Sequence, residues 1–181
     1  MSDSVLIAGK ILAALTIVGQ VWIFFVFLFL FVVKKGAART AFLGLFKGKE
    51  IFFAFLIAFF SAAASMFYSG VAKFPPCDLC WYQRIVLFPQ VLLLGMAVIK
   101  KDKKITDYVL AFSIIGAVIA AYNYYLQLGG NPFIPCSAGG VSCAQRFVWE
   151  FGYVGIPMMS FTGFAIIICL MLIEKLSAEK K

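Results

Sequence analysis

The sequence predicts an all-α integral membrane protein with five spanning helices. Of its 181 residues, 64% are hydrophobic, and the mean hydropathy of +1.00 lies far above that of a soluble domain. The apolar residues come in long runs, whereas the strands of a membrane barrel would alternate apolar and polar residues. The runs and the short loops between them leave no room for a separate soluble domain.

The first apolar run extends from Val5 to Val33 and is interrupted only by Lys10. It is longer than the apolar segment of a signal peptide, its leading tip carries Asp3 and no basic residue, and no small-x-small cleavage site follows it. We therefore expect an uncleaved membrane-spanning helix that covers about Ile11 to Val33.

Later apolar runs are also long enough to cross a membrane as helices. They predict spans over residues 51–68, 79–99, 105–126 and 157–173. A longer loop over residues 127–156 separates the last two spans. Within this loop, residues 146–152 predict one or two turns of amphipathic helix at the membrane interface, with Arg146 and Glu150 spaced for an ion pair.

The net charge of +8 does not indicate a nucleic-acid partner. The basic residues lie in short loops between the apolar runs, where membrane topology explains them better. Alternating spans place 12 of the 16 basic residues on one side, which the positive-inside rule makes cytoplasmic. The other side holds Cys77, Cys80, Cys136 and Cys143. Four of the five cysteines are thus expected to face the periplasm or the cell exterior, where disulfides persist.

The strongest chemical signal is Pro75-Pro-Cys-Asp-Leu-Cys-Trp-Tyr-Gln-Arg84. Cys77 and Cys80 have the Cys-x-x-Cys spacing of an exchangeable redox pair. Asp78 is expected to cap the following helix, which places Cys80 near a helix N-terminus, where positive partial charge stabilises a thiolate. Two other interpretations of this pair are a structural disulfide and half of a zinc site. Zinc sites of this kind usually serve cytosolic or nuclear folds, and the chain contains no His, so we predict redox chemistry and no metal.

A second pair, Cys136 and Cys143, encloses Ser-Ala-Gly-Gly-Val-Ser. The glycines would let the backbone bend and leave the sulfurs accessible to an outside thiol. Taken alone, this loop is equally typical of a passive surface disulfide. Together with the first pair on the same membrane face, it predicts a relay of two dithiols. Cys169 lies inside the last apolar run, and we assign it no role.

Arg84 follows Cys80 by four residues, so the two side chains share one face of the helix. An arginine inside a membrane helix is costly, which favours a role in polarising an electron acceptor, although such side chains also extend to the interface without any chemical role. Gln83 and Gln90 in the same span are suited to hydrogen-bond either a carbonyl group or another helix.

The sequence resembles the disulfide-bond formation protein B (DsbB) family, and especially its compact BdbC-like branch. The resemblance is carried by Cys77-Asp-Leu-Cys-Trp-Tyr-Gln-Arg84, by the Cys136 to Cys143 loop, and by Gly155-Ile-Pro-Met-Met-Ser160. It implies a four-helix transmembrane bundle over residues 51–181. Residues 1–50 would then add an N-terminal transmembrane helix and a basic cytoplasmic loop, which the family pattern does not explain.

The resemblance also implies a thiol-disulfide oxidoreductase of the bacterial inner (cytoplasmic) membrane that supports disulfide formation in exported proteins. A reduced thioredoxin-fold, DsbA-like oxidoreductase would attack the Cys136–Cys143 disulfide, with Cys136 in the mixed disulfide and Cys143 exchanging with Cys77. The Cys77–Cys80 pair would pass two electrons to ubiquinone or menaquinone from the membrane quinone pool. Cys80 would lie nearest the ring, and Arg84 would bind the quinone.

Two rival functions stay open at this point. A vitamin-K-epoxide-reductase-like enzyme usually carries its quinone-side Cys-x-x-Cys after the loop cysteines, whereas Cys77 and Cys80 here precede them. A non-enzymatic membrane scaffold with structural disulfides would not require Arg84 below Cys80.

Overall fold

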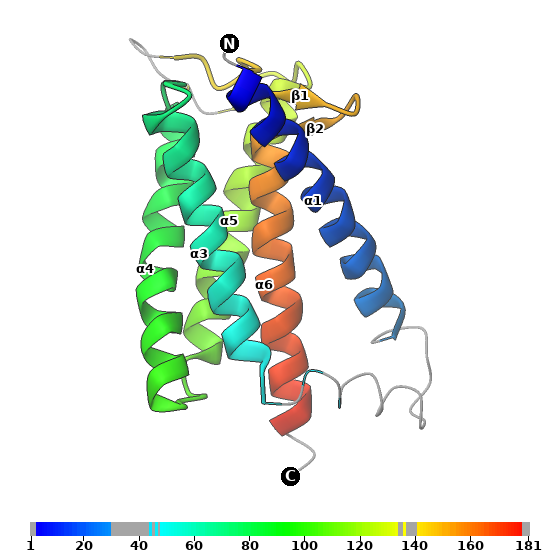
Figure 1. Ribbon diagram of the computed structural model, residues 1–181, viewed down its shortest axis with the longest axis vertical. Coiled ribbons are helices and arrows are strands. Elements are labelled where there is room, and N and C mark those ends of the chain that lie inside the picture. Colours follow the sequence, from blue (N-terminus) through cyan, green and yellow to red (C-terminus); the bar gives the residue numbers. More distant parts are fainter. Residues whose placement is uncertain are drawn as a thin grey trace.

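The computed structural model describes residues 3–29, 44, 46, 48–133, 136 and 141–178. Its long helices are α1 (Asp3–Phe27), α3 (Glu50–Gly70), α4 (Asp78–Lys100), α5 (Thr106–Gln127) and α6 (Ile156–Ala178), and a hairpin pairs β1 (Trp149–Glu150) with β2 (Val154–Gly155). Within the described residues, five helices are long and apolar enough to cross a membrane (Figure 1). The prediction of an all-α multi-pass membrane protein is confirmed.

The predicted start of the first span was wrong. The helix begins at Asp3, because nothing between Asp3 and Ile11 breaks it and the side chain of Lys10 is exposed. A lysine near a helix end can extend its ammonium group to the membrane interface, so it does not end an apolar helix. The predicted end of this span at Val33 lies outside the described residues.

The last span also continues beyond its predicted end at Ile173. Glu174 does not stop α6, because its carboxylate is buried, accepts a hydrogen bond of 3.0 Å from Thr106 Oγ1 and lies 3.1 Å from Lys103 Nζ. One turn of helix therefore follows a residue that sequence alone places in the tail. The other three spans agree with the predicted ranges to within two residues at each end.

Helices α3, α4, α5 and α6 form a four-helix bundle around one hydrophobic core (Figure 1). Small residues let these helices approach closely, as is typical in membranes. Gly116 on α5 faces the ring of Phe164 on α6, and a Cβ atom at Gly116 would lie 2.4 Å from Phe164 Cζ. The close contact of α5 with α6 therefore requires glycine, which has no side chain, at position 116.

Helix α1 packs against α6 and reaches the hairpin (Figure 1). Gly19 lies against Thr162 and Ile166 of α6. The Gln20 amide makes two polar contacts: its Nε2 donates to Thr162 Oγ1 at 3.2 Å, and its Oε1 accepts from the Tyr153 hydroxyl at 2.7 Å. The additional helix is thus held to the bundle by specific side-chain contacts, while its opposite face is exposed and apolar.

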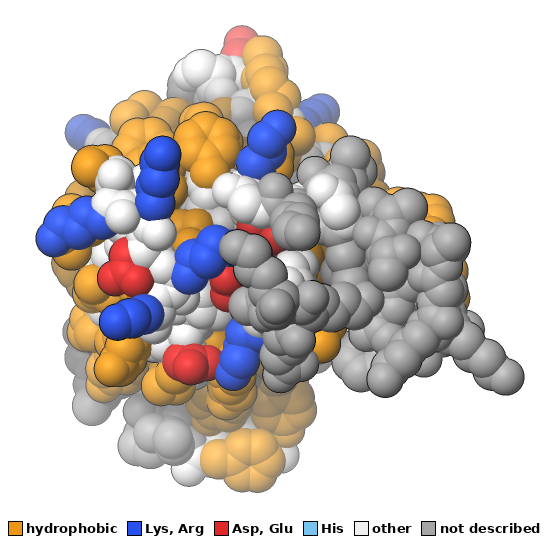
Figure 2. All heavy atoms as spheres, turned by 90° about the horizontal axis from the view of Figure 1, so that it is seen from below, with side chains coloured by type: hydrophobic (Ala, Val, Ile, Leu, Met, Phe, Trp, Pro, Cys, Tyr) orange, Lys and Arg blue, Asp and Glu red, His pale blue; other side chains and the backbone are white. Residues whose placement is uncertain are grey.

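Basic side chains gather at the end of the bundle where α3 begins, α4 ends and α6 ends, with carboxylates between them (Figure 2). The described members of this group are Lys49, Lys100, Lys101, Lys103, Lys104 and Lys175. The Cys77 to Cys80 stretch and the hairpin lie at the opposite end (Figure 1). The segregation of charge agrees with the topology expected from sequence, and the assignment of this end to the cytoplasm stays a prediction.

The predicted amphipathic helix over residues 146–152 was wrong. Trp149 and Glu150 form β1, and Phe151 and Gly152 have φ angles of +52° and +79°, in the left-handed region that a right-handed helix cannot contain. The guanidinium of Arg146 lies over the Trp149 ring, 4.1 Å from its centroid, and donates from Nε to the Gln127 carbonyl at 2.7 Å. The predicted ion pair with Glu150 is not formed between these described residues.

Candidate functional site

The two cysteines of the Cys-x-x-Cys pair lie at the start of α4. Cys77 occupies the N-cap position with an extended backbone, and Asp78 is the first helical residue, so the prediction of Asp78 as the cap was wrong by one position. Pro75 and Pro76 favour an extended backbone before the helix. This extended segment ends at Cys77, so the helix begins at Asp78. Cys80 is then the third helical residue, within the first turn, where backbone N–H groups and the helix dipole favour negative charge.

The two sulfurs face one another. Cys77 Sγ and Cys80 Sγ are 2.9 Å apart and share a hydrogen bond. This hydrogen bond and burial together raise the pKa of the Cys77 thiol above its ordinary range. Cys77 is therefore the member of the pair that keeps its proton, and negative charge falls to Cys80.

The second pair is a disulfide between Cys136 and Cys143, with Cα atoms 6.1 Å apart. Cys143 is 3% exposed, whereas Cys136 is only partly buried. Cys143 shares a hydrophobic cluster with Cys77 and Leu126, and Cys80 and Cys136 pack against this cluster. The structure thus brings together four cysteines that are as many as 66 positions apart in the sequence, from Cys77 to Cys143.

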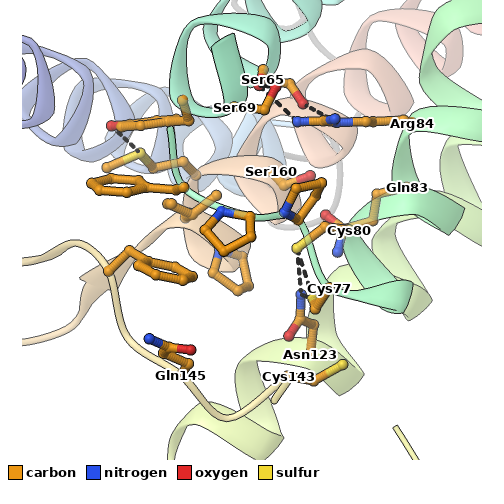
Figure 3. A pocket seen from close by; sticks show the side chains of 18 of the residues that line it. Ser65, Ser69, Cys77, Cys80, Gln83, Arg84, Asn123, Cys143, Gln145 and Ser160 are labelled. Carbon is orange, nitrogen blue, oxygen red and sulfur yellow. Dashed lines mark hydrogen bonds between the residues drawn. The ribbon is translucent and has the colours of Figure 1, made fainter. Parts of the chain in front are cut away.

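A cavity lies beside the Cys77–Cys80 pair. Its volume of about 130 Å³ is roughly ten times the ~10–15 Å³ that one water molecule needs. Its walls come from α3, α4, the end of α5, the start of α6 and the loop that carries Cys143 (Figure 3). Polar lining residues include Ser65, Gln83, Arg84, Asn123, Gln127 and Gln145, and apolar ones include Tyr68, Phe74, Leu87, Phe147 and Met159.

Arg84 lines this cavity together with Cys80, as the four-residue spacing predicts. Arg84 is 8% exposed. It donates from Nε to Ser65 Oγ and from Nη2 to the Ser65 carbonyl, each at 2.8 Å (Figure 3). Arg84 therefore does not extend to the interface; it is held inside the bundle at the cavity wall.

The two glutamines of α4 have different surroundings. Gln90 joins two helices, because its Oε1 accepts from Ser113 Oγ of α5 at 2.8 Å and its Nε2 donates to the Val86 carbonyl. Gln83 is 7% exposed, lines the cavity, and its Nε2 has no hydrogen-bond partner. The alternatives left open from sequence are thus divided between the two residues: Gln90 joins helices, and Gln83 offers a free donor to the cavity.

Asn123 was missed by the sequence analysis. It lies on α5, is 1% exposed, and its Nδ2 is 3.7 Å from Cys80 Sγ and 3.9 Å from Cys77 Sγ (Figure 3). A polar residue in an otherwise apolar span was a usable signal. Ser65 was also missed, and no sequence pattern links it to Arg84. Cys169 packs with Val26 and Ile173 away from the cavity, and the described residues contain no cluster of ligands for a metal ion.

Comparison with protein-family models matches residues 49–173 to the family described as disulfide bond formation protein DsbB. The matched range holds more than half of the chain and contains the Cys77–Cys80 pair, Arg84 and the Cys136–Cys143 loop.

The chain belongs to the DsbB family.

Relatives of the chain are named as disulfide formation proteins B or C. Probable disulfide formation protein C 2 of Bacillus cereus is 42% identical over 126 residues, which make up 69% of this chain and 90% of the relative. Disulfide bond formation protein C of Bacillus subtilis is 36% identical over 127 residues, or 69% of this chain and 91% of the relative. An SPbeta prophage-derived disulfide bond formation protein B of Bacillus subtilis is 43% identical over 113 residues, or 62% and 76%. No solved structure shows a significant match.

Membership of the DsbB family gives this membrane protein a role in disulfide bond formation, as a disulfide oxidoreductase. The resemblance to the BdbC-like branch is confirmed, since the relatives named disulfide formation protein C match most of their length. Helix α1 lies before the matched range and is an addition to the part that the DsbB family model describes.

Proposed function

We propose that this DsbB-family protein reoxidises a thioredoxin-fold dithiol oxidoreductase outside the cytoplasm and passes the electrons to a membrane quinone. The observation that carries the proposal is the hydrophobic cluster that brings both cysteine pairs together beside a cavity lined by Arg84. A scaffold with structural disulfides needs neither a second pair next to the first nor a cavity beside it.

The first step is attack on the outer disulfide. A thiolate of the reduced partner bonds to Cys136, the Cys136–Cys143 bond breaks, and the electron pair leaves on Cys143. The difference in burial supports this order, because Cys136 is partly exposed whereas Cys143 is 3% exposed. The partner's second thiolate then releases Cys136, and the partner leaves as a disulfide.

The second step transfers the electrons inward. Cys143 attacks Cys77 of an oxidised Cys77–Cys80 pair, and the electron pair leaves on Cys80. Their common cluster supports direct exchange between Cys143 and Cys77. When Cys136 resolves the mixed disulfide, the outer pair is oxidised again and the Cys77–Cys80 pair holds the two electrons, with the proton on Cys77 and the negative charge on Cys80.

The cavity residues fit a quinone. A bound quinone supplies an acceptor for two electrons and two protons. Gln83 Nε2 is a buried donor without a partner, which suits a carbonyl oxygen, and Arg84 adds a positive charge where an oxygen would gain electrons. Leu87, Phe74 and Phe147 give apolar walls suited to a ring. Cys77 and Cys80 release two electrons as their S–S bond forms, one proton comes from the Cys77 thiol, and the second would come from solvent.

The proposal is tested with the full chain in lipid vesicles, without oxygen, using a reduced thioredoxin-fold dithiol protein as the partner. Partner thiols are counted by alkylation and mass spectrometry, with menaquinone, with ubiquinone and with no quinone. Without quinone, oxidation should stop at two partner molecules or fewer per chain, because the chain holds two redox-active cysteine pairs, Cys77–Cys80 and Cys136–Cys143. With the right quinone, oxidation should continue until the partner is consumed.

Continued turnover without quinone would contradict the proposed acceptor, and a partner that stays reduced in all three samples would contradict the whole path. A Cys169→Ser variant is the matched control, since Cys169 lies away from the cavity.

A further inference from the structure

The amide of Asn123 contacts both sulfurs of the Cys77–Cys80 pair. Its Nδ2 lies 3.7 Å from Cys80 Sγ and 3.9 Å from Cys77 Sγ, within the range of hydrogen bonds to sulfur (Figure 3). The contact crosses from α5 to α4, two helices that pack against one another. It does not follow from the Cys-x-x-Cys motif, in which no residue of α5 takes part.

The surroundings of this amide indicate a chemical role. Asn123 is 1% exposed, and burying an amide is costly unless hydrogen bonds compensate for lost water. Here the Nδ2 donates to the sulfurs and the Oδ1 has no partner, so the residue is poorly compensated as a structural contact. Ser113 and Gln90, by contrast, satisfy one another across the same pair of helices. A neutral thiol is a weak acceptor, whereas a thiolate is a strong one, so the Asn123 contact gains most when a sulfur is charged.

We propose that Asn123 is a catalytic residue that donates its amide N–H to the Cys80 sulfur whenever the Cys77–Cys80 bond opens. The inference rests on the proposed function, in which Cys80 is the leaving sulfur. As Cys143 attacks, the Cys143–Cys77 bond forms, the Cys77–Cys80 bond breaks, and the electron pair of the broken bond stays on Cys80. The amide hydrogen bond stabilises this developing thiolate and so speeds its departure.

The same contact biases the redox equilibrium of the pair. A hydrogen bond that is stronger to the thiolate than to the disulfide stabilises the reduced form, which makes the Cys77–Cys80 pair a stronger oxidant. Removing it should shift the equilibrium toward the disulfide by about tenfold, since a hydrogen bond to a charged group is typically worth ~1.5–3 kcal/mol and sulfur is at the weak end of this range. For a two-electron couple, tenfold corresponds to about 30 mV.

The test measures this equilibrium directly and needs neither quinone nor partner. The full chain is equilibrated with glutathione redox buffers until the disulfide fraction stops changing. Free thiols are then alkylated, and the Cys77–Cys80 and Cys136–Cys143 fractions are read separately by peptide mass spectrometry. Asn123→Leu keeps the size and removes the donor, and we expect about a tenfold shift for the Cys77–Cys80 pair and none for the outer pair.

Two further variants make the result decisive. Asn123→Asp replaces the donor with a carboxylate that repels a thiolate, so it should shift the equilibrium in the same direction and further; it decides the matter if Asn123→Leu fails to fold. Ser113→Ala removes a buried hydrogen bond of the same helix away from the sulfurs and should lower the unfolding temperature only. A wild-type equilibrium in the folded Asn123 variants, or an equal shift in Ser113→Ala, would overturn the role of Asn123 and leave the proposed electron path standing.

Discussion

Arg84 of α4 is bound to Ser65 of α3 by two hydrogen bonds of 2.8 Å, one to the side-chain Oγ and one to the backbone carbonyl. The guanidinium has five N–H donors in a planar fork, so these two bonds fix its plane and leave donors available to the cavity. A lysine could not be oriented in the same way, because its ammonium group rotates freely on a flexible chain.

The first prediction concerns this arginine. If Arg84 binds the quinone, Arg84→Ala should lower kcat/KM for quinone by roughly ten- to a hundredfold, the value of one charge-assisted hydrogen bond. Single-turnover oxidation of the partner by the pre-oxidised protein should not change, because that step uses the outer pair. Arg84→Lys should recover part of the loss. An unchanged kcat/KM in a folded Arg84→Ala protein would remove Arg84 from the site.

The second prediction concerns the cysteines. Serine at Cys77, Cys80, Cys136 or Cys143 should abolish repeated oxidation of the partner, because each variant lacks one sulfur of the relay. Cys136→Ser should also prevent the mixed disulfide, whereas Cys80→Ser should leave it detectable on a denaturing gel without reductant. Full turnover in any of the four serine variants would exclude the relay as drawn.

The third prediction is one of stability. Gly116→Ala places a Cβ atom against the fully buried ring of Phe164, which must move to accept it. Overpacking of this kind typically costs about 1–3 kcal/mol. Thermal unfolding in detergent should show a clear decrease in Tm. Gly70→Ala is the matched control, since a Cβ there has open space around it, and its Tm should stay the same or rise slightly.

The fourth prediction is the topology. In a variant without native cysteines, single cysteines are introduced in place of the exposed residues Asp3, Asn131 and Lys104. A membrane-impermeant maleimide added to intact cells should label the first two positions, and label the third only after the membrane is opened. Labelling at Lys104→Cys from outside would reverse the orientation inferred from the basic residues.

The long helices could be predicted from the sequence because apolar length dictates them in a membrane. The boundaries that failed were decided by single polar residues. Lys10 lies within α1 because its side chain is exposed. Glu174 lies within α6 because its carboxylate contacts Thr106 and Lys103, a pairing that the sequence alone does not show. The hairpin at Trp149 was missed because a short segment rich in aromatic residues suits either a strand or an interfacial helix.

Some residues of the candidate site could be predicted from the sequence, and others could not. Cys77, Cys80 and Arg84 belong to one continuous motif, so local helix geometry was enough to group them. Asn123 and Ser65 join the site only through the packing of α5 and α3 against α4. Contacts between helices depend on their rotation and crossing, and one sequence without its fold does not contain that information in readable form.

The unequal burial of Cys136 and Cys143 affects how small thiols outside the membrane can react with this protein. Small thiols outside the membrane can approach Cys136, but Cys143 and Cys77 lie beneath the protein surface at 3% and 7% exposure. Under the proposed path, electrons reach Cys77 only after a thiol has opened the outer disulfide at Cys136. Burial then acts as kinetic insulation: it slows direct attack on Cys77, so that small reductants reach the quinone-facing pair only through Cys136.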